Sequence, residues 1–107
     1  MVLSEENCSP PSPGSLPLSV GEAVRLSREV PAWSLKEGSI EREFKFKDFK
    51  GAMAFTNTVA GVADSQDHHP DILISYNRVR LTLTTHKTGG LTRNDFILAS
   101  RIDRLQG

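Results

Sequence analysis

Apolar and charged side chains alternate over residues 40–47. Ile40, Phe44 and Phe46 share one parity, and the other parity carries only charged side chains (Glu41, Glu43, Lys45 and Lys47). Strict alternation is typical of a strand with one buried face and one solvated face. Arg42 has the apolar parity and is the one departure from the pattern. We therefore expect an antiparallel strand here, with its apolar face toward a core.

The period changes to that of a helix after Asp48. Apolar and small residues then recur three and four positions apart, at Phe49, Ala52, Met53, Thr56, Val59, Ala60 and Ala63. This spacing predicts a helix of about 16–18 residues with one broad apolar stripe. Asp48 is a suitable N-cap, and Pro70 keeps the helix from continuing past His69.

Two more alternating runs predict a β-hairpin. Ile72–Tyr76 and Val79–Leu83 flank the dipeptide Asn77-Arg78, which is expected to form the tight turn. The alternation of the first run places Tyr76 in the core. The second run has Val79, Leu81 and Leu83 on its buried parity.

The segment before these elements predicts a short helix and a first strand. Ser19 and Glu22 have the spacing of a capping box, so a helix is expected over about residues 20–29, and Pro31 ends it. Residues 33–35 then precede a turn-forming stretch and predict the first strand. Trp33, the first residue of this strand, is expected to have a packing role.

A last helix is expected near the C-terminus. Thr92 and Asp95 have the spacing of a capping box, with Asp95 as the third helical residue. Gly89-Gly90 before it is predicted to be a turn rather than a phosphate loop, because no lysine follows the glycines. The apolar stripe of this helix is Phe96, Ile97, Ala99, Ile102 and Leu105.

The element order is α-β-β-α-β-β-α. Two hairpins joined by a long helix predict an α+β fold, a four-stranded antiparallel sheet with helices on one face. Residues 18–107 are expected to form this single domain. Residues 1–17 hold four of the six prolines and few apolar side chains, so they predict a flexible, solvated tail. Cys8, the only cysteine, would then lie outside the folded part.

Composition limits the classes of function. Thirteen basic and thirteen acidic residues cancel, so the basic surface that direct nucleic-acid binding usually requires is not expected. The apolar runs are too short to span a membrane, and the first residues lack the order of a signal peptide. These features favour a cytoplasmic protein without direct nucleic-acid or membrane contact.

The candidate chemistry lies in residues 64–95, which contain all three histidines, His68, His69 and His86. Histidine has an unperturbed pKa near 6.5, so clustered imidazoles indicate acid/base chemistry first and a metal site second. Asp64 lies one helical turn before His68 and is predicted to hydrogen-bond it, and Asp67 is a second carboxylate within reach.

Two considerations constrain this cluster. His86 has the parity of Arg80, Thr82 and Thr84, which places it on the outer face or at the rim of the sheet. The alternative of a zinc site would use the histidines and Asp64. Adjacent histidines rarely reach one ion and no cysteine is nearby, so we predict no metal.

The spacing Asp64, His68-His69-Pro70, Tyr76, His86 and Asp95 resembles the signature of the pterin-4a-carbinolamine dehydratases. This family is also known as the dimerisation cofactor of a homeodomain transcription factor. The resemblance covers about residues 18–106 and extends to neighbouring words such as Gly89-Gly90-Leu91-Thr92. Asp64 stands where the family often has Glu, and Ile72-Leu73 replaces the Trp-Phe pair of animal members.

The resemblance implies that the protein removes water from 4a-hydroxytetrahydropterin, without a metal or another cofactor. His68, His69 and His86 would carry the proton transfers, with neither acid nor base assigned to one of them. Residues implied to bind the substrate or to tune the histidines are Asp64, Asp67, Thr84, Thr85 and Asp95. For Asp95, the helix-capping role predicted from its spacing already explains the residue without a part in substrate binding.

The resemblance also implies partners. A homodimer or homotetramer is expected, with the apolar stripe of residues 49–63 as a contact surface. Animal members also bind a transcription factor, so a nuclear location beside the cytoplasmic one, or a role as a protein-binding scaffold, is the alternative. The intact histidines favour catalysis, because a scaffold does not need them.

Overall fold

The computed structural model describes residues 3–106; residues 1, 2 and 107, at the ends of the expected tail and domain, lie outside the described part. Within it, a four-stranded antiparallel sheet has the order β1-β2-β4-β3. Its strands are β1 (Ser34–Lys36), β2 (Ser39–Lys45), β3 (Asp71–Ser75) and β4 (Arg78–Leu83).

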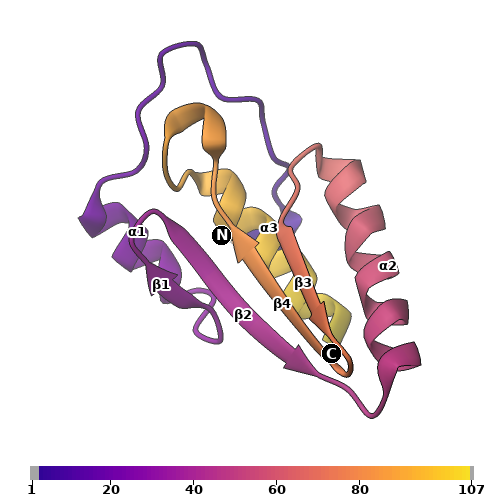
Figure 1. Ribbon diagram of the computed structural model, residues 1–107. Helices are drawn as coiled ribbons and strands as arrows, with labels where there is room; N and C mark the ends of the chain where they lie inside the picture. Colours follow the sequence, from indigo (N-terminus) through magenta and orange to yellow (C-terminus); the bar gives the residue numbers. More distant parts are fainter. Residues whose placement is uncertain (1–2, 107) are drawn as a thin grey trace.

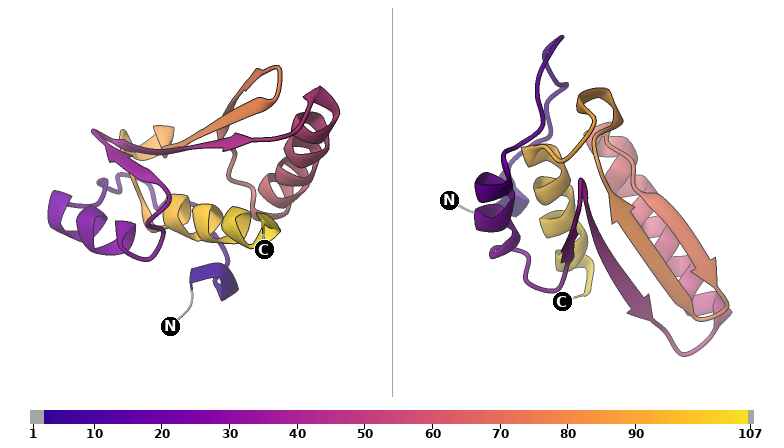
Figure 2. Two further views of the ribbon diagram at one scale, coloured as in Figure 1. Left: turned by 90° about the horizontal axis from the view of Figure 1, so that it is seen from below. Right: turned by 60° about the vertical axis from the view of Figure 1, so that its left-hand side comes forward.

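The three α-helices all cover the same face of the sheet (Figures 1 and 2). Short 3-10 turns lie at both ends of the chain and after β4. The predicted α+β class and element order are therefore confirmed. The helices are α1 (Val20–Ser27), α2 (Phe49–Gln66) and α3 (Arg93–Asp103), and the turns are η1 (Leu3–Glu5), η2 (His86–Thr88) and η3 (Arg104–Gln106).

The core lies between the two central strands and α3. In the register of β2 with β4, Ile40 pairs with Leu83 and Phe44 pairs with Val79, and all four side chains are buried. Helix α3 is buried along most of its length, because the sheet covers one side and α1, α2 and η1 cover the others. Its buried positions include the predicted Phe96, Ile97, Ala99 and Ile102.

Arg42, the exception in the alternating pattern, is accommodated by a polar contact at the edge of the core. Its Nη1 donates a 2.6 Å hydrogen bond to Asp103 Oδ1, and its guanidinium lies 4.3 Å from the centroid of the Phe44 ring. The same Asp103 oxygen accepts a 2.7 Å bond from Nε1 of buried Trp33. The predicted packing role of Trp33 is therefore confirmed.

The hairpin differs from its prediction by one residue. The turn is made by Tyr76 and Asn77, and Tyr76 has a left-handed backbone (φ 51) and a side chain that is 66% exposed. The placement of Tyr76 in the core was wrong because β3 ends at Ser75, one residue before the alternation ends. Asn77 then fixes the turn by donating from Nδ2 to Phe46 O at 2.9 Å.

The N-terminal segment differs more from its prediction. Instead of a solvated tail, residues 3–9 pack along α3, and Leu3 is only 2% exposed (Figure 2). Cys8 is half-buried against the core, so its placement outside the folded part was wrong. The composition of the segment could not show this, because its anchoring partners lie 58 to 95 residues away along the chain.

Pro17 continues this packing at the loop before α3. The Leu18 N–H donates to Leu91 O at 2.8 Å, which ties the segment to the Gly-Gly turn. A Cβ at Gly90 would lie 2.9 Å from Pro17 Cβ, closer than real contacts allow. Gly90 is thus required by close approach, and Gly89 by its positive φ of 75 at the end of η2. The predicted turn at these glycines is confirmed.

None of the helices in the described part of the chain has the length and apolar character needed to cross a membrane.

We expect Gly90→Ala to destabilise the fold by about 1–3 kcal/mol, because the added methyl group must displace the rigid ring of Pro17. Gly61→Ala is the matched control: a Cβ there meets nothing within 4 Å, and alanine favours the helix by about 0.5–1 kcal/mol. Chemical denaturation of both variants measures the difference. Equal stability of the two variants would contradict the packing of Pro17 on Gly90.

Candidate active site

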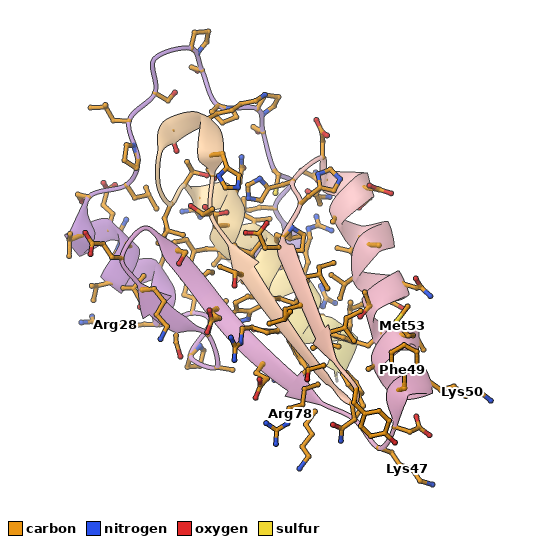
Figure 3. All side chains as sticks on the ribbon, viewed as in Figure 1. Arg28, Lys47, Phe49, Lys50, Met53 and Arg78 are labelled. Atoms are coloured by element: carbon orange, nitrogen blue, oxygen red, sulfur yellow. The ribbon has the colours of Figure 1, made fainter. Side chains whose placement is uncertain are left out.

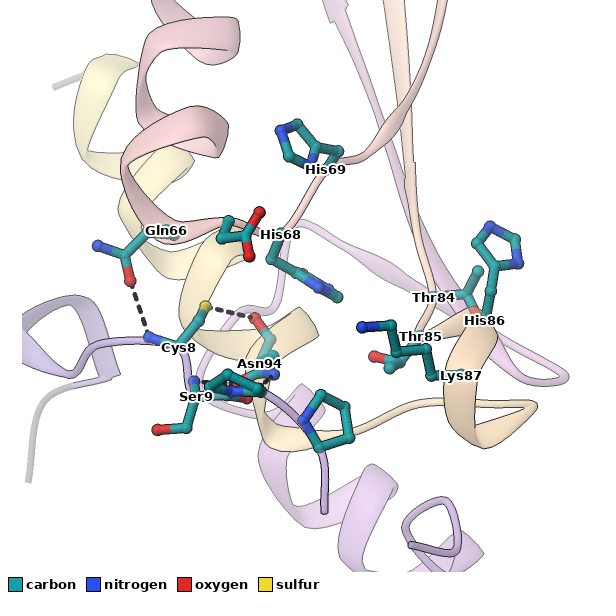
Figure 4. A pocket seen from close by; sticks show the side chains of 13 residues that line it. Cys8, Ser9, Gln66, His68, His69, Thr84, Thr85, His86, Lys87 and Asn94 are labelled. Carbon is teal, nitrogen blue, oxygen red and sulfur yellow. Dashed lines mark hydrogen bonds between the residues drawn. The ribbon is translucent and has the colours of Figure 1, made fainter. Parts of the chain in front are cut away.

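The histidine cluster opens onto a cavity of about 380 Å³ at one end of the sheet (Figure 4). A volume of this size falls within the range of small-molecule sites. Four separate segments line the cavity: the N-terminal segment, the end of α2, the end of β4 with η2, and the start of α3. The lining residues are Cys8, Ser9, Pro10, Pro11, Gln66, Asp67, His68, His69, Thr84, Thr85, His86, Lys87 and Asn94.

The end of α2 sets the direction of His68 and His69. Asp67 caps the helix in the left-handed conformation (φ 49, ψ 40), which turns the chain sharply after Gln66. The His68 N–H still donates to Ala63 O at 3.2 Å, so the turn is tied to the helix. Asp67, predicted as a tuning carboxylate, lines the cavity with an exposed side chain.

His68 pairs with Asp95 at the start of α3. His68 Nε2 lies 2.5 Å from Asp95 Oδ1, and the Asp95 side chain is completely buried. Asp95 Oδ2 accepts two further hydrogen bonds of 2.9 Å, from Thr85 Oγ1 and from the Thr92 backbone N–H. A buried carboxylate with three donors is held in one orientation, and it therefore holds the imidazole as well.

The capping role predicted for Asp95 is confirmed, since it closes a capping box with Thr92 as the third residue of α3. Its contact with His68 was missed. The two residues are 27 positions apart, and only the packing of α2 beside α3 brings them together.

The predicted contact between Asp64 and His68 was wrong. Asp64 Oδ1 instead lies 2.9 Å from Nε2 of His69, and both side chains are largely exposed. The prediction assumed helical geometry up to His68, but the left-handed Asp67 ends that geometry and turns His69 back toward the helix.

These two contacts bear on the tautomers of the rings. Because an ionised carboxylate only accepts hydrogen bonds, a pair with an ionised Asp95 or Asp64 requires the proton on Nε2 of His68 or His69. In each neutral ring, Nδ1 is left as the acceptor. A carboxylate in this position fixes the ring and stabilises positive charge that forms on it.

His86 lies in η2, beyond the last strand, and this rim position agrees with its predicted parity. The strand end is fixed by Thr84, whose Oγ1 donates to Gly38 O at 2.7 Å, and by buried Thr85. No hydrogen bond to the His86 ring is formed within residues 3–106. His86 therefore differs from the two carboxylate-bound histidines.

Several lining residues were missed by the sequence prediction: Gln66, Lys87, Asn94 and the N-terminal residues 8–11. Gln66, Lys87 and Asn94 each adjoin a predicted site residue or its neighbour in the sequence, so proximity alone could have indicated them. The N-terminal residues carried no such signal. Burial raises the pKa of the Cys8 thiol to about 11, so it stays protonated at neutral pH.

Within the described residues, no three or more His, Cys, Asp and Glu side chains form a group that could hold a metal ion. His68 and His69 contact different carboxylates, those of Asp95 and Asp64. The two oxygens of Asp95 are already in contact with His68, Thr85 and the Thr92 N–H.

Residues 17–105 match the family described as Pterin 4 alpha carbinolamine dehydratase. The chain belongs to this family. A relative from Alkaliphilus metalliredigens is 42% identical over 106 residues, covering 97% of this chain and 96% of the relative. One from Chloroflexus aurantiacus is 49% identical over 90 residues, covering 84% and 97%. Both relatives are provisionally assigned as pterin-4-alpha-carbinolamine dehydratases. The predicted family is thereby confirmed.

One solved structure agrees with this membership, and a second shares the fold. The transcriptional coactivator/pterin dehydratase from Brucella melitensis has a TM-score of 0.80 and 35% identity, covering 85% of this chain and 99% of the other. A pterin dehydratase-like protein described as a RuBisCO assembly factor in the alpha-carboxysome has a TM-score of 0.58 and 22% identity, covering 70% and 87%. The second similarity shows the fold alone. The roles of individual site residues stay predictions.

The pairing of His68 with Asp95 can be tested without an activity assay. Long-range ¹H–¹⁵N NMR of the histidine rings is expected to show the Nε2–H tautomer for neutral His68. Asp95→Asn replaces the acceptor with an amide and should change the His68 ring signals. The matched control Asp64→Asn should affect His69 and leave His68 unchanged. An identical His68 spectrum in wild type and Asp95→Asn would contradict the pairing.

Proposed function

We propose that this protein is a 4a-hydroxytetrahydrobiopterin dehydratase, acting in the cytoplasm in tetrahydrobiopterin recycling. The reaction removes water from the 4a-carbinolamine and leaves quinonoid dihydropterin. The observation that carries the proposal is the convergence of three imidazoles, His68, His69 and His86, on one cavity. Family membership supports the substrate class.

The chemistry requires two proton transfers. The C4a–O and N5–H bonds break, and a C4a=N5 double bond and a water molecule form. One group donates a proton to the departing hydroxyl, and another accepts the proton from N5, so the enzyme ends with the protons it began with. Imidazoles serve both steps near neutral pH, and the reaction needs neither a metal nor another cofactor.

His68 and His86 come from different elements and lie on different sides of the cavity (Figure 4). Because Asp95 occupies Nε2 of His68, this ring exchanges its proton through Nδ1, and the carboxylate balances the charge of the imidazolium. His86 has both nitrogens available to substrate or water. A substrate between these rings has a proton donor and a proton acceptor on opposite sides.

The remaining predicted residues act on this pair or on the substrate. Asp64 orients His69, a third imidazole available for proton transfer, at the exposed side of the cavity, and Thr85 helps to hold the Asp95 carboxylate. Asp67 and Thr84 line the cavity, where they are available to polar groups of the pterin. Asp95 is a positioning residue, because His68 stands between it and the cavity.

We expect His69→Ala and His86→Ala each to lower the dehydration rate, by about 10²–10⁴-fold where the histidine carries a transfer. Both side chains are largely exposed, so the fold should tolerate the changes. A stopped-flow assay on chemically generated 4a-hydroxytetrahydropterin measures the rate, and circular dichroism controls for folding. Wild-type turnover in both variants would defeat the proposed mechanism.

We also propose that the protein assembles as a homodimer or homotetramer. Large apolar side chains are exposed on the edge strand β3, its turn and the neighbouring start of α2, where Figure 3 labels Phe49. An edge strand also presents unpaired backbone groups. The same surface supports the alternative function of a protein-binding scaffold. Its exposed members are Phe49, Ile72, Leu73 and Tyr76.

Leu73→Arg is expected to convert the assembly to monomers or to weaken it by at least about tenfold, because a charge replaces apolar contact on β3. Leu16→Arg is the matched control, since Leu16 is 86% exposed and far from β3 along the chain. Light scattering coupled to size-exclusion chromatography gives the mass of each variant. An unchanged assembly in Leu73→Arg would place the contact elsewhere.

A further inference from the structure

The N-terminal strap, defined here as residues 3–11, contributes to the cavity although it lies before the residues 17–105 that match the family. Cys8, Ser9, Pro10 and Pro11 line the cavity together with the histidines. In Figure 4, Cys8 and Ser9 lie across the cavity from Thr84, His86 and Lys87. The strap therefore forms a wall that the family-matched part of the chain does not supply.

A charged contact anchors the first part of the strap to α3. The Arg93 guanidinium donates two hydrogen bonds, of 2.7 and 2.6 Å, to the two carboxylate oxygens of Glu6. Arg101 donates from Nε and Nη2 to the backbone oxygen of Glu6, at 3.0 and 2.6 Å. Bidentate pairs of this kind fix orientation as well as position.

Amide side chains anchor the part of the strap that lines the cavity. Asn94 accepts from the Ser9 N–H at 3.0 Å and donates to Ser9 O at 2.7 Å, as a neighbouring strand would. Gln66 Oε1 accepts from the Cys8 N–H at 2.8 Å. Asn94 precedes Asp95 and Gln66 lies two residues before His68, so the strap is anchored beside the hydrogen-bonded pair of His68 and Asp95.

We propose that residues 8–11 of the strap form a substrate-binding wall that packs against the planar ring of the pterin and contributes to specificity. This inference rests on the proposed function. The two pyrrolidine rings and the thiol offer an apolar surface suited to one face of a flat heterocycle. Both charged groups of the Glu6–Arg93 pair are satisfied by each other, outside the cavity lining.

The wall acts in binding rather than in proton transfer. Serine and proline do not titrate near neutral pH, and the Cys8 thiol, with its pKa raised to about 11 by burial, stays protonated there. Loosening the strap should therefore raise KM and leave kcat nearly unchanged. Loss of a histidine lowers kcat, so the two kinds of variant are distinguishable.

The anchor persists through the pH range in which histidines titrate. The hydrogen bond from Arg93 lowers the pKa of the Glu6 carboxyl in the folded protein. A lowered folded-state pKa contributes stability that is present above the unfolded-state pKa and is lost as the pH falls through the folded-state pKa. The anchor is thus complete at neutral pH and weakens only in acid.

The first test combines Glu6→Gln with the double variant Pro10→Ala/Pro11→Ala. Each is expected to raise KM about 5–10-fold with kcat within about twofold of wild type, which corresponds to the loss of a modest apolar or anchoring contact. Glu5→Gln, the exposed neighbour of Glu6, is the matched control and should behave as wild type. KM values equal to the control in both variants would overturn the proposal.

The second test uses the reactivity of Cys8, the only cysteine of the chain. A disulfide reagent such as DTNB, at pH 8, should label wild type slowly. Labelling of Glu6→Gln should be at least about tenfold faster, because release of the strap exposes the thiol and returns it toward an ordinary pKa. A saturating dihydropterin should slow labelling of the wild type.

The outcomes separate the two proposals. If wild type does not dehydrate the carbinolamine, the proposed function fails, whatever the strap does. If wild type is active but dihydropterin does not protect Cys8, the strap does not contact the ligand and the inference fails. If Glu6→Gln labels no faster than Glu5→Gln, loss of the Glu6 anchor does not expose Cys8. The Pro10→Ala/Pro11→Ala variant, which keeps every anchor, then decides: a raised KM supports the wall, and an unchanged KM overturns it.

Discussion

The buried carboxylate of Asp95 is the contact on which the rest of the structure depends. It satisfies the first turn of α3, binds Thr85 after the end of β4 and holds the ring of His68 after the end of α2. A buried charge is costly unless it is fully bonded, so the three partners must be present together. The folding requirement of a helix cap and the orientation of a proposed catalytic ring are thereby met by the same atoms.

Most of the fold could be predicted from the spacing of apolar residues and from the residues that cap the helices. The alternation at β2, the three- and four-residue spacing of α2 and the capping boxes of Ser19 and Thr92 gave elements close to those observed. Arg42 broke the pattern because Asp103 on α3 neutralises its charge, and a partner 61 residues away cannot be predicted from local spacing. The turn at Tyr76 was misplaced because alternation alone does not show where a strand stops pairing.

The three histidines that line the cavity could be predicted from the sequence, but their carboxylate partners and several other lining residues could not. The signature spacing selected all three histidines and the acids around them, yet the carboxylate partner of His68 was misassigned. One left-handed residue, Asp67, changed the partner by ending the helix earlier than the spacing assumed. The N-terminal strap was missed because its anchors, Gln66, Arg93, Asn94 and Arg101, follow it by 58 to 95 positions.

This long sequence separation has a consequence for synthesis of the chain. The strap leaves the ribosome before α3, the helix to which it docks. His68 and His69 also emerge well before Asp95. A nascent chain that lacks α3 therefore carries the three histidines without their arrangement, and the cavity is completed only when α3 folds. Truncated translation products would lack an organised cavity.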